Sequence, residues 1–201
     1  MTTASPPQPP TSAAPTERRA TLRIDAQPGG KRFQGVWLEL PDGKRWVLDY
    51  RARELWRAFA DHEVVVTGHC YQPQGQAILA THFEVERLRR AVPVRGAGPY
   101  LEIGPTRVLR GTLVATPAPP GSKLAGTSRT VFHADDGEAY QLVGDQVPPA
   151  GAIVQIRGRV LAPDMSFVAR GDGPDLWVLD VRDPDAVRDP EHEPARTDCP
   201  E

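Results

Sequence analysis

The sequence has few of the features that mark membrane spans or disulfide frameworks. No apolar run approaches the roughly eighteen residues that a spanning helix needs. Only 2 of its 201 residues are cysteine, and aromatic residues make up 6%. The first 15 residues also lack the apolar run of a secretory signal, so we expect a cytoplasmic protein with no membrane partner. Arginine far outnumbers lysine, which occurs only at Lys31, Lys44 and Lys123 and favours a bacterial source.

The two cysteines lie far apart in sequence. Cys70 falls in an apolar strand pattern, whereas Cys199 is among the last three residues. We therefore expect no disulfide between them, which agrees with a cytoplasmic location. Strand alternation points Cys70 inward, so we expect it to be an inert core residue. The alternative is that Cys70 is a redox-active thiol. Cys199 is expected to be an exposed free thiol.

No grouping of residues indicates catalysis. The histidines are scattered, and no Cys-x-x-Cys or His-x-x-x-His spacing marks a metal site. The two Gly-x-Gly sequences, at 96–98 and 171–173, do not open a helix after a strand, as a phosphate-binding loop would. The sequence therefore predicts a protein that is not an enzyme and binds no metal or cofactor.

Abundant turn residues indicate an all-β protein. The 22 prolines and 18 glycines suit short strands joined by many turns. Two apolar-rich segments, residues 20–90 and 107–182, are separated by a Pro/Gly-rich linker at 91–106. Residues 1–19 are expected to form a disordered Pro-rich arm, and residues 183–201 a disordered acidic tail.

Two hairpins show that the apolar segments are related. The first hairpin consists of a strand at Val36–Leu40, a turn at Pro41–Gly43 and a strand at Lys44–Leu48. The second hairpin follows 94 positions later, with strands at 130–134 and 138–142 and a turn at 135–137. In each turn the glycine suits the left-handed position of a three-residue hairpin loop. This turn length pairs Leu40 with Lys44, Leu38 with Trp46 and Val36 with Leu48 in the first hairpin. In the second it pairs Phe132 with Tyr140 and Thr130 with Leu142. A two-residue turn would shift the register.

The other predicted elements recur in the same order. A strand precedes each hairpin (21–26 and 107–115), and two strands follow it (64–70 and 82–88; 154–160 and 176–181). Gly68 and Gly158 lie where a strongly coiled strand bends. Residues 51–60 predict a short amphipathic helix in the first segment only.

This order resembles the OB-fold, a five-stranded Greek-key barrel. The resemblance implies two tandem five-stranded OB-like barrels, the first with a short helix between its third and fourth strands. Such domains usually bind ligands on the outer face of strands two and three. On that face of the first barrel we expect Phe33 and Trp37 to stack on bases, while Lys44, Arg45 and Arg51 hold phosphates. The alternative is that Trp37 packs against its own domain.

Charge is unevenly divided. Residues 1–98 carry 14 basic and 10 acidic residues, a net of +4, whereas residues 99–201 carry a net of −6. The acidic second half, the Pro-rich arm and the missing catalytic groups favour a non-enzymatic adaptor or assembly subunit that binds other proteins. The alternative function is binding of single-stranded nucleic acid through the first barrel. The sequence leaves the oligomeric state open.

Overall fold

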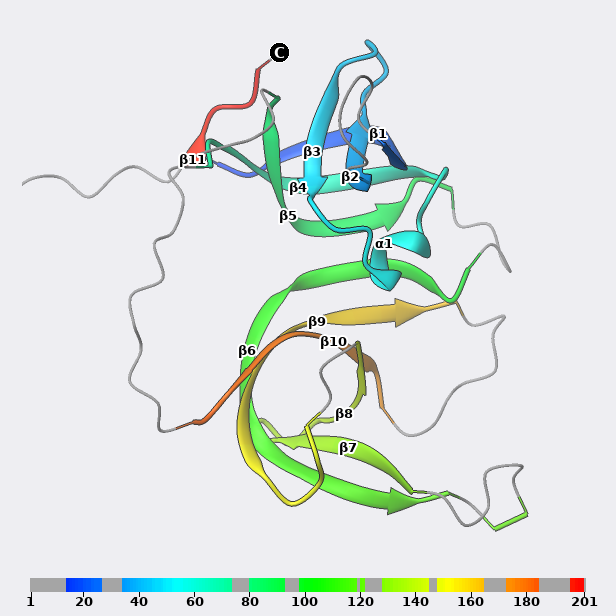
Figure 1. Cartoon of the computed structure of the whole chain (residues 1–201), viewed down its shortest axis with the longest axis vertical. Helices are drawn as coiled ribbons and strands as arrows, with labels where there is room; N and C mark the ends of the chain where they lie inside the picture. Colours follow the sequence, from blue (N-terminus) through cyan, green and yellow to red (C-terminus); the bar gives the residue numbers. More distant parts are fainter. Residues whose placement is uncertain are drawn as a thin grey trace, which may run out of the picture.

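The computed structural model describes residues 14–26, 34–73, 80–92, 98–118, 120–121, 128–144, 148–164, 173–184 and 196–200. It is an all-β structure (Figure 1). Its elements are β1 (Thr16–Ala26), β2 (Gln34–Glu39), β3 (Arg45–Asp49), α1 (Glu54–Arg57), β4 (Glu63–Tyr71), β5 (His82–Arg90), β6 (Tyr100–Pro117), β7 (Ser128–Ala134), β8 (Ala139–Val143), β9 (Ile153–Pro163), β10 (Asp175–Arg182) and β11 (Arg196–Thr197).

All the strands belong to one mixed sheet, whose pairings form two closed cycles. In the first cycle β1 pairs with β2, β2 with β3, β3 with β5, β5 with β4, and β4 with β1 again. In the second cycle β6 to β10 repeat these pairings strand for strand. The β3–β5 and β8–β10 pairs are parallel, and every other pair is antiparallel. No helix among the described residues is long and apolar enough to cross a membrane.

Both predicted hairpins are present. Leu38 pairs with Trp46, and Phe132 pairs with Tyr140, as the turn length predicts. In the first turn the Leu40 amide donates to the Lys44 carbonyl at 2.9 Å, and the equivalent bond closes the second turn. The third prediction, Val36 opposite Leu48, is wrong. Val36 lies opposite Asp49 because a bulge between Val36 and Trp37 shifts the register by one residue.

Two glycines allow adjacent strands to approach closely. A Cβ on Gly68 of β4 would lie 2.0 Å from the carbonyl oxygen of Glu84, beside a bulge in the β4–β5 pairing. A Cβ on Gly158 of β9 would lie 2.8 Å from the carbonyl oxygen of Trp177, close to a bulge in the β9–β10 pairing. The glycine bends predicted at these equivalent positions are therefore required by backbone contact.

The helix expected over 51–60 is one α-helical turn, Glu54–Arg57, followed by turn residues 58–61. Its apolar residues Leu55, Trp56 and Phe59 are buried in the first core, as an amphipathic pattern requires. A segment of ten residues is short for an isolated helix, so packing decides how much of it is helical.

The strand β6 passes from one cycle to the other. Residues 100–106, which we expected in a linker, are the beginning of this 18-residue strand. There Ile103 pairs with Leu88 of β5 and is fully buried in the first core. Farther along, β6 pairs with β7 and β9. The prolines and glycines of 91–106 suggested turns, but pairing with β5 and β9 extends the strand, and a bulge between Ile103 and Thr106 accommodates Gly104 and Pro105.

Two main cores correspond to the two cycles, and the first draws residues from both. Ile103, Leu161 and Trp177, all from the second half of the chain, join the core of the first cycle. The second core is built around Leu113, Phe132, Tyr140, Ile156 and Leu176. The two cycles are thus packed against each other as well as linked by β6.

Two arginines complete this junction. Arg90 of β5 is 4% exposed, and its guanidinium donates to the carbonyl oxygens of Ala58 at 2.6 Å and Tyr100 at 3.1 Å. Arg159 of β9 donates in the opposite direction, to the carbonyl oxygens of Val85 and Glu86 in β5. Burial lowers the pKa of Arg159 to about 10, which leaves the guanidinium charged at neutral pH. The charge is therefore held by backbone dipoles across the junction.

Parts of the predicted arm (1–19) and tail (183–201) belong to strands. β1 begins at Thr16, so residues 16–19 belong to a strand rather than to a Pro-rich arm. Residues 196–197 of the predicted acidic tail form β11, which pairs with β4. The expected arm at 1–13 and the tail at 185–195 lie outside the described residues. Composition indicated disorder at both ends, but it carries no information about pairing with a distant strand.

The expectation that Cys70 and Cys199 are unpaired is wrong. They form a disulfide across 129 positions of sequence. The physical reason is the pairing of β11, which places Thr197 opposite Cys70 and brings Cys199 to β4. The expectation of a cytoplasmic location rested partly on unpaired cysteines, and this disulfide removes that support.

Replacing Arg159 tests the junction. We expect Arg159→Met to lower the free energy of unfolding by about 1–3 kcal/mol, because the carbonyl oxygens of Val85 and Glu86 lose their buried donor. Chemical denaturation measures the change. Arg107→Met, at an exposed position of β6, is the matched control and should change stability by less than about 0.5 kcal/mol. Equal effects of the two substitutions would contradict a specific role for Arg159.

Candidate functional site

The predicted binding face lies on β2 and β3, and its central residues interact with each other. Trp37 and Arg45 project from neighbouring strands, with the Arg45 guanidinium carbon 5.5 Å from the centroid of the Trp37 ring. Arg45 Nη2 donates to Asp25 Oδ2 of β1 at 2.6 Å. The cation that we expected to hold phosphate therefore already has a carboxylate partner.

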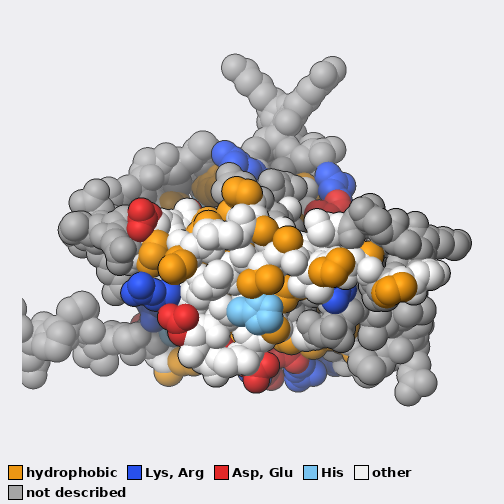
Figure 2. All heavy atoms as spheres, turned by 90° about the horizontal axis from the view of Figure 1, so that it is seen from below, with side chains coloured by type: hydrophobic (Ala, Val, Ile, Leu, Met, Phe, Trp, Pro, Cys, Tyr) orange, Lys and Arg blue, Asp and Glu red, His pale blue; other side chains and the backbone are white. Residues whose placement is uncertain are grey.

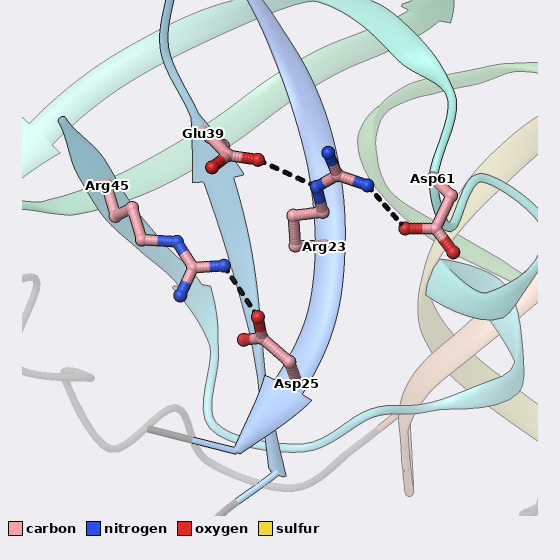
Figure 3. A network of polar contacts seen from close by, with 5 residues as sticks. All are labelled: Arg23, Asp25, Glu39, Arg45 and Asp61. Carbon is pink, nitrogen blue, oxygen red and sulfur yellow. Dashed lines mark hydrogen bonds and ion pairs between the residues drawn. The ribbon is translucent and has the colours of Figure 1, made fainter. Parts of the chain in front are cut away.

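The neighbouring charges are paired in the same way (Figure 3). Arg23 of β1 lies between two carboxylates: Nε donates to Glu39 Oε2 at 2.7 Å, and Nη1 donates to Asp61 Oδ1 at 2.8 Å. The hydrogen bond from Arg23 lowers the pKa of Glu39, and the bond to Glu39 raises the pKa of Arg23. Each group thus favours the charged form of the other. The face carries a network of compensated charges rather than a cationic track.

The aromatic ring on this face is covered. Trp37 is 4% exposed and forms a small core with Val47, against which Tyr50 and Ala80 pack. A base can stack only on an accessible ring face. The structure therefore agrees with the alternative left open by the sequence, in which Trp37 packs within its own domain.

Among the described residues, the predicted binding residues Lys44 and Arg51 do not converge on Trp37. Lys44 lies in the hairpin turn, where Nζ is 3.1 Å from Asp42 Oδ2. Arg51 follows the opposite end of β3, and its backbone amide donates to Asp49 Oδ1. Phe33 lies outside the described residues. Of the four predicted residues that the structure describes, only Trp37 and Arg45 are brought into contact.

A Tyr–His–Tyr cluster, which sequence reasoning missed, supports this covered face. The fully buried His82 Nε2 is 2.5 Å from Tyr50 Oη, and the ring centroids of Tyr71 and His82 are 5.6 Å apart. Burial lowers the pKa of His82 and raises the pKa of Tyr50 and Tyr71, so all three groups are uncharged at neutral pH. Because Tyr50 packs against Trp37, His82 helps to hold the cover in place. The parallel pairing of β3 with β5 places His82 opposite Val47, near Tyr50, and the antiparallel pairing of β4 with β5 places Tyr71 opposite His82.

A cleft of about 660 Å³ lies at the junction of the two cycles. Leu55 of α1, Tyr100 of β6 and Trp177 of β10 contribute to its walls, with Arg57 and His62 also lining it. Tyr100 is held by a hydrogen bond from its hydroxyl to Asp175 Oδ2 at 2.7 Å. This volume falls within the range of small-molecule pockets, but its lining combines no recognisable set of catalytic groups.

The second cycle exposes apolar side chains on its outer face. Val114 and Val108 of β6 are 40% and 49% exposed, and Ile153 of β9 is 58% exposed. Thr112 lies opposite both His133 and Ile153, so the side chains of β6, β7 and β9 form one continuous surface. Figure 2, which views the molecule from below, shows hydrophobic side chains gathered around a histidine among polar groups. We call Val108, Val114 and Ile153 the apolar stripe.

No group of three or more histidine, cysteine, aspartate or glutamate side chains is arranged to hold a metal ion in the described part of the chain. No protein-family model matches the sequence, and no curated protein or solved structure is significantly similar to it.

The lowered pKa of His82 predicts acid sensitivity. The ordinary pKa of histidine is about 6.5. At pH values below this, His82 takes up a proton in the unfolded chain, whereas burial keeps it uncharged in the folded protein. Stability should therefore fall as the pH drops from about 6.5 toward the lowered folded-state pKa. We expect His82→Gln to show a shallower decline over this range, measured by denaturation at a series of pH values.

His133→Gln is the matched control, because His133 is exposed on β7. This variant should keep the wild-type slope between pH 6.5 and 5. A wild-type slope in His82→Gln would show that His82 does not cause the acid sensitivity.

Proposed function

We propose that this protein is a non-enzymatic binding module of two tandem OB-like barrels that acts as an adaptor or assembly subunit for other proteins. The two strand cycles support the fold assignment. Each pairs its strands in the order 1-2-3-5-4-1 with a parallel 3–5 pair, and in the first cycle α1 lies between the third and fourth strands. This arrangement is similar to the five-stranded OB barrel.

The observation that carries the functional proposal is the apolar stripe. Its three side chains are 40–58% exposed on adjacent strands of a sheet face. Exposed apolar surface rimmed by polar groups is typical of protein contact sites. Charged groups lie among these side chains: Arg110, between Val108 and Val114 on the same face of β6, is 3.9 Å from Asp135, and exposed Arg157 lies opposite Val108. Such a surface fits a protein partner that has its own apolar patch.

The contacts on β2 and β3 argue against the alternative, single-stranded nucleic acid. Phosphate would have to displace Asp25 from Arg45, and a base would have to displace Tyr50 from Trp37. Both exchanges cost interactions that the folded protein already makes. The same reasoning predicts that removing the carboxylates should create affinity for polyanions.

An oligonucleotide titration tests this contrast. We expect the wild-type protein to show no salt-dependent change in tryptophan fluorescence with a single-stranded DNA of about 16 nucleotides. The double variant Asp25→Asn, Glu39→Gln should gain weak binding that falls as salt rises, because Arg45 loses its carboxylate partner and Arg23 keeps only Asp61. Salt-dependent wild-type binding that is lost in Trp37→Ala, Arg45→Glu would instead establish the nucleic-acid function.

A stripe variant tests the adaptor proposal. Ile153→Lys places a charge in the apolar stripe, and Val92→Lys places the same charge at an exposed site after β5, where Val92 is 59% exposed. Affinity purification of tagged protein from its native cells should recover a stoichiometric protein with the wild type and with Val92→Lys, but at least tenfold less with Ile153→Lys. Equal recovery by the two variants, or no stoichiometric protein with the wild type, would contradict the proposal.

A further inference from the structure

The only two cysteines of the chain are joined in the folded protein. Cys70, on β4, is 1% exposed, whereas Cys199 is only partly buried and follows β11 near the C-terminus. Along the sequence, Cys199 comes after all the strands of the second cycle, and the bond joins it to β4 of the first cycle. It therefore decides where the C-terminal segment 196–200 lies.

The segment covers a part of β4 that its other neighbour leaves open. β1 pairs with β4 only as far as Thr16 opposite Gly68. Beyond that point β11 continues, with Thr197 opposite Cys70 and Arg196 opposite Tyr71. Without β11, the edge of β4 at Cys70 and Tyr71 would present unpaired backbone groups.

Among the described residues, the backbone pairing of this segment is short, and Cys199 packs against the first core. β11 is two residues long, and Arg196 Nη2 is 3.7 Å from Glu84 Oε2, with both side chains about a third exposed. An ion pair of this kind contributes little in water. Two paired residues also cannot offset the conformational entropy lost by ordering the segment. The covalent bond is the strongest connection between this segment and β4.

We propose that the Cys70–Cys199 cystine is a redox-controlled latch, and that its reduction releases residues 196–200 from the edge of β4. The reductant is a dithiol. One of its thiolates attacks Cys199 Sγ, the more accessible sulfur, and Cys70 leaves as a thiolate that takes up a proton. The second thiol then displaces Cys199 from the mixed disulfide. Two electrons pass to the protein, and the reductant becomes a disulfide.

The released edge has a defined chemistry. Residues 70–71 would offer backbone donors and acceptors to an added extended strand, the mode used in β-strand addition. The rest of the first cycle is expected to remain folded, because its β1–β4 and β4–β5 pairings do not include the segment. The oxidised form, with the latch closed, is the form in which the edge is protected from other chains.

Hydrogen exchange followed by mass spectrometry tests the latch. Dithiothreitol should raise exchange at least tenfold in peptides covering 196–200 and 69–71 of the wild-type protein, with no change at 64–66. Cys199→Ser should show the fast exchange without reductant and no further response to it. Alkylation under denaturing conditions should find no free thiol before reduction and two after it.

Three results would overturn the proposal. Exchange at 196–200 that is unchanged by reduction would show that noncovalent contacts hold the segment. Fast exchange throughout 64–66 in Cys199→Ser would show that the bond is required for the fold and is not a latch. Two free thiols in protein purified without reductant would show that the bond does not form.

Discussion

The junction between the two strand cycles is the constraint on which the rest of the structure depends. β6 leaves its pairing with β5 and becomes the first strand of the second cycle. On either side of it, Arg90 and Arg159 donate to backbone carbonyl groups in opposite directions. Rotating one cycle against the other would leave buried guanidinium groups without hydrogen-bond acceptors, and this would lower the stability of the folded protein. The two cycles therefore keep one relative orientation.

A fixed orientation gives the surfaces of the molecule distinct roles. On β2 and β3 the charges are compensated within the face, and Tyr50 covers the indole ring of Trp37. On β6 and β9, in the second cycle, apolar side chains remain exposed. The proposed adaptor function uses this difference. A rigid module can hold a partner on the apolar stripe at a set position relative to the first cycle and to the edge of β4 that β11 covers.

The sequence predicts what local chemistry determines. The two hairpins, most of their interior positions and the glycines at 68 and 158 follow from turn residues and from alternation. The candidate site depends on contacts that local patterns do not contain. From the sequence, Arg45 is predicted to be a free cation, because its partner Asp25 lies 20 residues earlier on another strand. Trp37 reads as exposed because alternation places it on the outer face, but Tyr50 and Ala80 cover it. Cys199 reads as a tail thiol because only the pairing of β11 with β4 brings it to Cys70.

The most direct test of the central claim is a measurement of residual dipolar couplings for backbone amides in both cycles. If the junction fixes their orientation, one alignment tensor will fit the couplings of β1–β5 and β6–β10 together, and the Arg159→Met protein will need two. Separate tensors for the two cycles in the wild-type protein would contradict a rigid junction.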